Sequence, residues 1–181
     1  MSDGRFIAVV GPSGVGKDSV MAGLGAADPH VRLVRRSITR IPSLGGEAFD
    51  AMTVREFECA VGNGAFCLHW EAHGLRYGIP CSVVGDVENG ADCLVNLSRS
   101  VLLQAAELFP SMIALHITAD PATLVKRILE RGRENSADIQ RRLARAALPL
   151  PTGLNVVEID NNGPLDDTIA AARAALQPVR V

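Results

Sequence analysis

The sequence predicts a single α/β domain built around a mainly parallel sheet. Short apolar runs, typical of buried strands, alternate with segments whose apolar residues recur at helical spacing. The chain has 181 residues, of which 48% are hydrophobic, so it can bury a sizeable core. A glycine-rich turn joins the first apolar run to the first helical segment. Strands that alternate with helices in this way indicate crossover connections and parallel pairing.

Five apolar runs predict the strands of this sheet, at 6–10, 31–34, 92–97, 112–118 and 156–159. Apolar residues at helical spacing predict the helices, which are expected at 17–24, after Thr53, between 101 and 109, after Asp120, at about 139–147 and over 165–176. Two of these helices carry start signals. Thr53 and Glu56 form a capping-box pattern, and Asp120 precedes a proline at the first helical position.

The stretch 35–90 interrupts the alternation of strands and helices. It contains several glycine pairs and near-pairs, including Gly45–Gly46 and Gly62–Gly64. We therefore expect one domain, 1–181, with a core formed by about 1–34 and 91–181 and an inserted lobe over about 35–90.

Charge and cysteine content exclude several classes of function. The 18 basic and 20 acidic residues give a net charge of −2, which leaves no broad basic surface for nucleic acid or membranes. The four cysteines are at least eight positions apart and match no zinc-finger spacing. The apolar run at 6–10 is too short for a signal peptide or a membrane span. These features predict reduced cysteines and a soluble, cytoplasmic protein, either a monomer or a homodimer.

A phosphate-binding pattern, G-x-x-x-x-G-K, follows the first predicted strand. Glycines let backbone N–H groups turn toward phosphate oxygens, and the helix that begins there adds the positive end of its dipole. Lys17 would reach the β- and γ-phosphates, and it is one of only two lysines in the chain. The residues expected to bind ATP here are Gly11, Pro12, Ser13, Gly14, Val15, Gly16, Lys17, Asp18 and Ser19.

Asp18 stands where such loops usually carry a serine or threonine that helps to hold Mg²⁺. A carboxylate is a hard oxygen ligand, and beside a triphosphate it would be repelled unless a cation lay between them. This favours Asp18 as a Mg²⁺ ligand. The alternative is an acidic residue that the dipole favours in the first helical turn. Ser19 is expected to donate to an α-phosphate oxygen.

The chain resembles the guanylate kinase group of P-loop kinases. The similarity lies in the loop 11–17, in the segment 37–42 followed by Gly46–Glu47, and in the later pairs Tyr77–Gly78 and Arg131–Gly132. It extends over nearly the whole chain. The resemblance implies the three-layer fold of nucleoside monophosphate kinases, with a parallel sheet, an inserted substrate-binding lobe and a short lid over about 131–147.

Two departures from the guanylate kinase pattern affect the acceptor site. In an alignment on Tyr77–Gly78, Leu68 replaces the glutamate, and Ser98 the aspartate, with which guanylate kinases read the guanine ring. Leucine cannot accept a hydrogen bond from a base. Ser43 also replaces an arginine of the phosphate-binding segment. An acceptor that has a phosphate but no guanine fits these changes.

The combination resembles the ribose 1,5-bisphosphate phosphokinase family. Its pattern is similar to four runs of this chain, at 16–19, 73–78, 95–99 and 131–135. The resemblance implies transfer of the γ-phosphoryl group of ATP, with Mg²⁺, to ribose 1,5-bisphosphate in phosphonate breakdown. The product would be 5-phospho-α-D-ribose 1-diphosphate (PRPP). A nucleoside monophosphate kinase of altered base preference and an inert guanylate-kinase-like binding module are the alternatives.

Arginines dominate the expected contacts to phosphate. Six of them lie between 127 and 145, on both sides of the loop 132–136 where a kinase lid would close. By position against the family, Arg131 and Arg142 join Lys17 as expected catalytic residues, and Arg133 is expected to bind ATP. The alternative for this cluster is an ion-paired surface, since Asp138 lies four residues before Arg142.

The residues expected to bind the acceptor lie in two places. Ser37 and Arg40 would bind its phosphate, and Tyr77 would either bind that phosphate or pack in the interior. Asn96, Ser98 and Arg99 lie at the end of a predicted strand, at the sheet edge where α/β proteins bind ligands. Asn96 would otherwise cap the next helix.

Overall fold

The computed structural model describes residues 4–41, 48–130 and 148–177. Its central sheet has five strands in the order β2-β7-β1-β8-β9, and every neighbouring pair is parallel. The strands are β1 (Phe6–Val10), β2 (Val31–Leu33), β7 (Asp92–Asn96), β8 (Ile113–Thr118) and β9 (Val156–Asp160). All five predicted strands are confirmed to within a residue or two at their ends.

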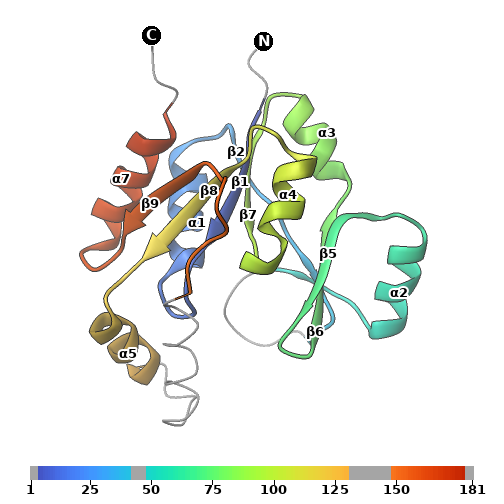
Figure 1. The fold of residues 1–181 in the computed structure, drawn as a ribbon, viewed down its shortest axis with the longest axis horizontal. Coiled ribbons are helices and arrows are strands. Elements are labelled where there is room, and N and C mark those ends of the chain that lie inside the picture. The colour runs from blue at the N-terminus through green and yellow to red at the C-terminus, as the bar shows by residue number, and fades with distance from the viewer. Residues whose placement is uncertain (1–3, 42–47, 131–147, 178–181) are drawn as a thin grey trace.

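Helices cover both faces of this sheet, which gives three layers (Figure 1). One face packs against α1 (Lys17–Ala27) and α7 (Leu165–Leu176), and the start of α5 (Pro121–Glu130) joins the same apolar cluster. The other face packs against α3 (Ser82–Glu88) and, after the short 3₁₀ turn η1 (Arg99–Val101), against α4 (Leu102–Leu108). The central strand β1 supplies residues to both clusters, so it lies at the middle of the core.

A second, four-stranded sheet lies within the stretch 35–90, in the order β4-β3-β6-β5. Its strands are β3 (Ser37–Ile38), β4 (Asp50–Ala51), β5 (Phe66–Ala72) and β6 (Leu75–Pro80), and α2 (Val54–Gly62) joins β4 to β5. The capping box that the sequence predicts at the start of α2 is present, because Glu56 N–H donates to the Thr53 hydroxyl at 3.2 Å and Thr53 N–H donates to Glu56 at 2.7 Å.

The second sheet shares its core with the central sheet. Leu68, Trp70 and Ile79, on β5 and β6, belong to the apolar cluster that contains Phe6 of β1. The helix α3, which the sequence analysis did not separate from the lobe, packs on the central sheet through Val83. The division into core and lobe stays a prediction, and the expected helix at 139–147 and lid at 131–147 lie outside the described residues.

Among the described residues, no helix has both the length and the apolar composition that crossing a bilayer requires.

Candidate active site

The phosphate-binding loop connects β1 to α1 at the carboxyl end of the central sheet. Gly14 and Gly16 have φ angles of 86° and 97°, a left-handed conformation that suits glycine. Gly16 occupies the N-cap position of α1 and has no side chain with which to cap the helix. The start of α1 therefore receives no side-chain cap from this residue, which suits a helix N-terminus that binds an anion.

Lys17 is positioned by the loop that precedes it. Its Nζ donates to the carbonyl oxygens of Gly11 at 2.9 Å and Pro12 at 3.1 Å. The ammonium group thus lies over the loop, within reach of phosphate groups that the loop would hold.

Asn161 contacts the back of the loop from the end of β9. Its side chain is only 4% exposed, and its Nδ2 donates to the carbonyl oxygen of Val15 at 2.7 Å. The buried hydroxyl of Thr168, on α7, donates to Asn161 Oδ1 at 2.7 Å. Arg127 Nη1, on α5, donates to the same Val15 oxygen at 3.4 Å. One loop carbonyl is therefore held from two other elements.

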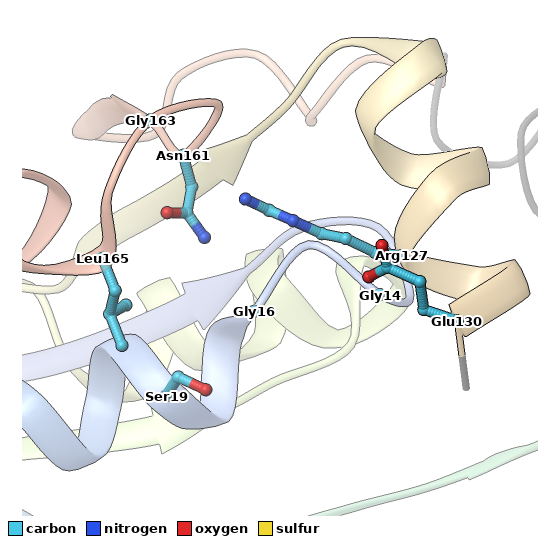
Figure 2. A pocket seen from close by; sticks show the side chains of 8 residues that line it. All are labelled: Gly14, Gly16, Ser19, Arg127, Glu130, Asn161, Gly163 and Leu165. Carbon is cyan, nitrogen blue, oxygen red and sulfur yellow. The ribbon is translucent and has the colours of Figure 1, made fainter.

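A pocket of about 320 Å³ opens beside the loop. Figure 2 shows Asn161 and Arg127 pointing toward one another above the segment that carries Gly14 and Gly16. The lining comes from the loop, α1, α5 and the β9–α7 turn, and consists of Gly14, Gly16, Ser19, Arg127, Glu130, Asn161, Gly163 and Leu165. A partly apolar cavity that adjoins a phosphate-binding loop suits the base and sugar of a nucleotide.

Asp18 and Asn96 meet at the end of β7. Asn96 Nδ2 donates to Asp18 Oδ1 at 3.3 Å, and the Asp18 side chain is exposed. Within the described ranges, no group of three or more histidine, cysteine or acidic side chains is arranged to hold a metal ion. The Asp18 carboxylate and the Asn96 amide oxygen are hard donors that fit a Mg²⁺ ion whose other ligands are phosphate and water.

The second sheet carries Ser37, Arg40 and Tyr77 on neighbouring parts of the chain, with Ser37 opposite Gly78 and Tyr77 opposite Ile38. Ser37 and Tyr77 lie on the paired strands β3 and β6, and Arg40 follows β3. The guanidinium of Arg40 lies 4.3 Å from the ring centre of Phe49. Its Nε is a buried polar atom for which the described part of the chain provides no hydrogen-bond partner. A buried, unsatisfied donor of this kind suits an oxyanion ligand.

Tyr77 is half-buried and packs against the apolar cluster that both sheets share, and its role stays a prediction. Its ring stacks on Trp70 with centres 5.3 Å apart, and the guanidinium of the buried Arg36 lies 5.1 Å from the Tyr77 ring centre. A second arginine therefore lies beside one of the residues that are expected to bind the acceptor. Leu68, at the position of the base-reading glutamate, is 1% exposed and belongs to the core, so it presents no polar group to a ligand.

Ser98 and Arg99 have partners of their own at the end of β7. The Ser98 hydroxyl accepts from Ser100 N–H at 3.4 Å, which caps η1. Arg99 Nη1 donates to the Leu148 carbonyl at 2.5 Å, and burial lowers the pKa of Arg99. The arginine thus connects the acceptor side of the sheet to the chain that follows residue 147.

His116 lies beside this arginine on β8, paired in register with Val10 and Glu158. Its Nδ1 is 3.3 Å from Glu158 Oε2. Burial and the charge of Arg99 lower the pKa of His116, while Glu158 opposes that shift. Burial and Arg99 therefore favour the neutral form of this imidazole.

The structure describes some of the expected site residues and not others. The structure brings 11–19 together at the loop, places Asn96 beside Asp18, and places Ser37, Arg40 and Tyr77 on or next to the paired strands β3 and β6; their roles stay predictions. Arg131, Arg133 and Arg142 lie outside the described residues. The sequence analysis missed Asn161, Thr168 and Gly163. Polar residues and a glycine directly after the last predicted strand were the signal, because ligands gather at that edge of a parallel sheet.

Comparisons with known proteins agree on one family. The chain is 52% identical over 178 residues to the ribose 1,5-bisphosphate phosphokinase PhnN of Ruegeria sp. (strain TM1040), covering 98% of this chain and 94% of that one. It is 43% identical over 176 residues to the PhnN of Pseudomonas fluorescens (strain SBW25), with 92% and 91% covered. No family model matches the chain.

A solved guanylate kinase from Anaplasma phagocytophilum matches the fold with a TM-score of 0.70, at 17% identity, over 97% of this chain and 86% of that one. This likeness confirms the fold expected from the sequence, that of the guanylate-kinase-like P-loop kinases. The extent of the identity to curated relatives decides the family within that fold, and the chain belongs to the ribose 1,5-bisphosphate phosphokinase PhnN family.

Proposed function

We propose that this protein transfers the γ-phosphoryl group of ATP to ribose 1,5-bisphosphate, giving 5-phospho-α-D-ribose 1-diphosphate and ADP. The observation that carries the proposal is the 52% identity, over nearly the whole chain, to a relative named for this reaction. The acceptor side agrees with it. Arginine is present there in Arg36 and Arg40, and the position that reads guanine in guanylate kinases is a buried leucine.

The donor nucleotide would lie across the loop, with its base in the pocket between α5 and the β9–α7 turn. Glu130 and Asn161 supply polar groups at that pocket, and Leu165 supplies apolar surface. The phosphates would be held by the N–H groups of the loop and by Lys17, whose charge stabilises the negative charge spread over the transferred group. Of the expected catalytic residues, Arg131 and Arg142 would add further positive charge.

The acceptor would bind through its phosphates on the second sheet. Arg40 and Ser37 would hold one phosphate, Tyr77 would orient Arg36 beside it, and Asn96, Ser98 and Arg99 would approach from the end of β7. The attacking atom is an oxygen of the 1-phosphate, which is already ionised at neutral pH. The reaction then needs positioning and charge neutralisation, and no general base.

Mg²⁺ belongs to this proposal as the partner of ATP. Asp18 would hold it, directly or through water, with Asn96 orienting the carboxylate by the 3.3 Å hydrogen bond. The bound ion would neutralise charge on the phosphates as the phosphoryl group is transferred.

The setting of the reaction is also part of the proposal. It would be phosphonate breakdown in the cytoplasm, with small molecules as ligands, no nucleic acid or membrane partner, and a monomer or homodimer as the active form. The net charge of −2 agrees with small-molecule ligands in place of nucleic acid or membranes, and the four free cysteines agree with a reducing compartment.

Phosphorus NMR tests the proposed reaction. Purified protein with Mg-ATP is offered ribose 1,5-bisphosphate in one tube and GMP in another. We expect the diphosphate product and ADP in the first tube alone. GDP in the second tube would contradict the interpretation of Leu68 and Ser98. ATP binding without turnover of either acceptor would favour the inert binding module.

A further inference from the structure

We infer that Asn161, oriented by Thr168, is a positioning residue that fixes the direction of the Val15–Gly16 peptide and so sets the affinity of the loop for nucleotide phosphates. The inference rests on nucleotide binding at the loop, and it is independent of which acceptor is phosphorylated.

The contacts of Asn161 leave its amide one chemically consistent orientation. The Val15 carbonyl can only accept, so the NH₂ end must face it, at 2.7 Å. The oxygen end then faces the Thr168 hydroxyl at 2.7 Å, and that hydroxyl has a proton to give. Its other acceptors, the carbonyls of Asp160 and Pro164, are more distant at 3.4 Å. Both side chains are buried, at 4% and 3% exposure, so water does not compete freely for these bonds.

The orientation of the Val15 carbonyl also sets the orientation of the Gly16 N–H, because both belong to the same peptide unit. The described residues contain no cis peptide bond, and in a trans peptide the C=O and N–H bonds point in opposite directions. With the Val15 carbonyl held toward β9, the Gly16 N–H is directed to the other side of the loop. Loops of this kind bind phosphate with such N–H groups. Asn161 therefore prepares one phosphate donor before the nucleotide arrives.

The same contact gives a reason for glycine at position 16. A Cβ at this position would lie 2.8 Å from Asn161 Nδ2, closer than real Cβ atoms approach, and the φ of 97° already favours glycine. The second glycine of the motif thus makes room for the Asn161 amide behind the loop, as well as allowing close approach to phosphate in front.

The two hydrogen bonds from Thr168 to Asn161 and from Asn161 to Val15, which we call the clamp, join parts of the chain that are far apart in sequence. Asn161 and Val15 are separated by 146 positions, and Thr168 lies on α7. Arg127 adds a weaker, 3.4 Å contact to the same carbonyl from α5. Because the Asn161 contact is shorter and buried, we assign the main positioning role to Asn161.

The test compares four variants by calorimetric titration with ADP and by steady-state kinetics. Thr168→Val keeps the shape of the side chain and removes the hydroxyl, whereas Thr168→Ser keeps the hydroxyl. Asn161→Asp replaces the donor with a carboxylate that repels the Val15 carbonyl. Asn162→Asp, at the exposed neighbouring asparagine, controls for the added negative charge near ATP.

We expect Thr168→Val and Asn161→Asp to weaken ADP binding and raise the KM for ATP by about tenfold, the effect of losing one buried hydrogen bond. Thr168→Ser and Asn162→Asp should stay within about twofold of the wild type, since each keeps the clamp. The KM for the acceptor should not follow the KM for ATP. A purely structural role would lower the melting temperature and move both KM values together.

Three results would overturn the inference: wild-type ADP affinity in a folded Thr168→Val variant, equal losses in the valine and serine variants, or equal losses in Asn161→Asp and Asn162→Asp. If Asn161→Asp fails to fold, the comparison of the two Thr168 variants decides. A wild-type protein that binds ADP yet leaves ribose 1,5-bisphosphate unchanged would defeat the proposed function and leave the clamp standing.

Discussion

The two lysines of the chain differ in what surrounds them. Lys17 is bound to the carbonyl oxygens of Gly11 and Pro12, whereas Lys126 lies on the exposed side of α5. Two residues of the same type, one on the loop and one on a helix surface, allow the role of the loop charge to be isolated.

Lys17→Ala should lower kcat by about 10²–10³-fold, the usual cost of removing a group that stabilises transition-state charge. The melting temperature should change little, because the lost hydrogen bonds leave carbonyls that water can reach. Release of ADP in a coupled assay measures the rate. Lys126→Ala is the control and should retain wild-type turnover; near-normal turnover by Lys17→Ala would contradict the mechanism.

Asp18→Asn separates the two interpretations of that carboxylate. If Asp18 holds Mg²⁺, the Mg²⁺ concentration for half-maximal rate should rise roughly tenfold. Titration of the rate with Mg²⁺ at fixed ATP measures it. Asp166→Asn, at the second residue of α7, removes a carboxylate from an equivalent helical position and should leave the requirement unchanged. An unchanged requirement in Asp18→Asn would support the helix-dipole explanation.

At the scale of elements, β8 and β9 carry a titratable pair. Burial and Arg99 hold the pKa of His116 below its ordinary value of 6.5. The folded protein then binds fewer protons than the unfolded chain once the pH falls below that value, so stability should be lost as the solution is acidified.

Urea unfolding at a series of pH values between about 7 and 5 measures this loss. In His116→Gln, the contribution of this residue to the slope of the unfolding free energy against pH should disappear. In Glu158→Gln the slope should steepen, because the carboxylate that raises the histidine pKa is gone. If the unfolding free energy depends on pH identically in the wild type and both variants, His116 does not contribute to the pH dependence of stability.

Gly78 on β6 lies where two elements approach closely. A Cβ there would lie 2.7 Å from the ring of Phe66, which itself stacks on Phe57 of α2 with centres 4.9 Å apart. Gly78→Ala should therefore destabilise the protein by about 1–3 kcal/mol through overpacking. It should also raise the acceptor KM, because Gly78 pairs with Ser37.

The matched substitution is Gly85→Ala in α3, where a Cβ would meet no atom within 4 Å. It should stabilise the protein by about 0.5–1 kcal/mol through helix propensity. Urea unfolding measures both free energies. A Gly78→Ala protein as stable as the wild type would mean that the Phe66 ring moves aside without cost.

At the scale of the whole molecule, the two sheets share one apolar cluster. Trp70 is the only tryptophan, and it lies on the second sheet within that cluster. Its fluorescence therefore reports on the second sheet, while far-UV circular dichroism reports on all helices and strands.

We expect the two signals to change at the same urea concentration, since the shared core couples both sheets into one transition. Leu68→Ala should move both midpoints together and cost about 2–5 kcal/mol. A fluorescence transition at lower urea than the dichroism transition would mean that the stretch 35–90 unfolds as an independent lobe.

The central sheet was predictable because its strands are short, mostly apolar segments that alternate with helices, and β1 is apolar throughout. The second sheet was not, because β3 and β4 are only two residues long and polar or charged residues interrupt the apolar residues of β5 and β6. The loop was predictable because its function is local in sequence. Asn161 was not, because its contact with Val15 spans 146 positions and depends on β9 lying beside β8.

The place of β1 in the middle of the central sheet has a consequence for how acceptor preference changes. On our proposal, the strand on one flank, β7, leads to acceptor residues, while β8 and β9 on the other flank lead to the nucleotide pocket. The two ligands thus meet at the loop but depend on separate halves of the molecule. An altered acceptor then requires substitutions on the second sheet and on the β7 flank beyond Asn96, and ATP affinity can be inherited unchanged as long as Asn96 keeps its contact with Asp18.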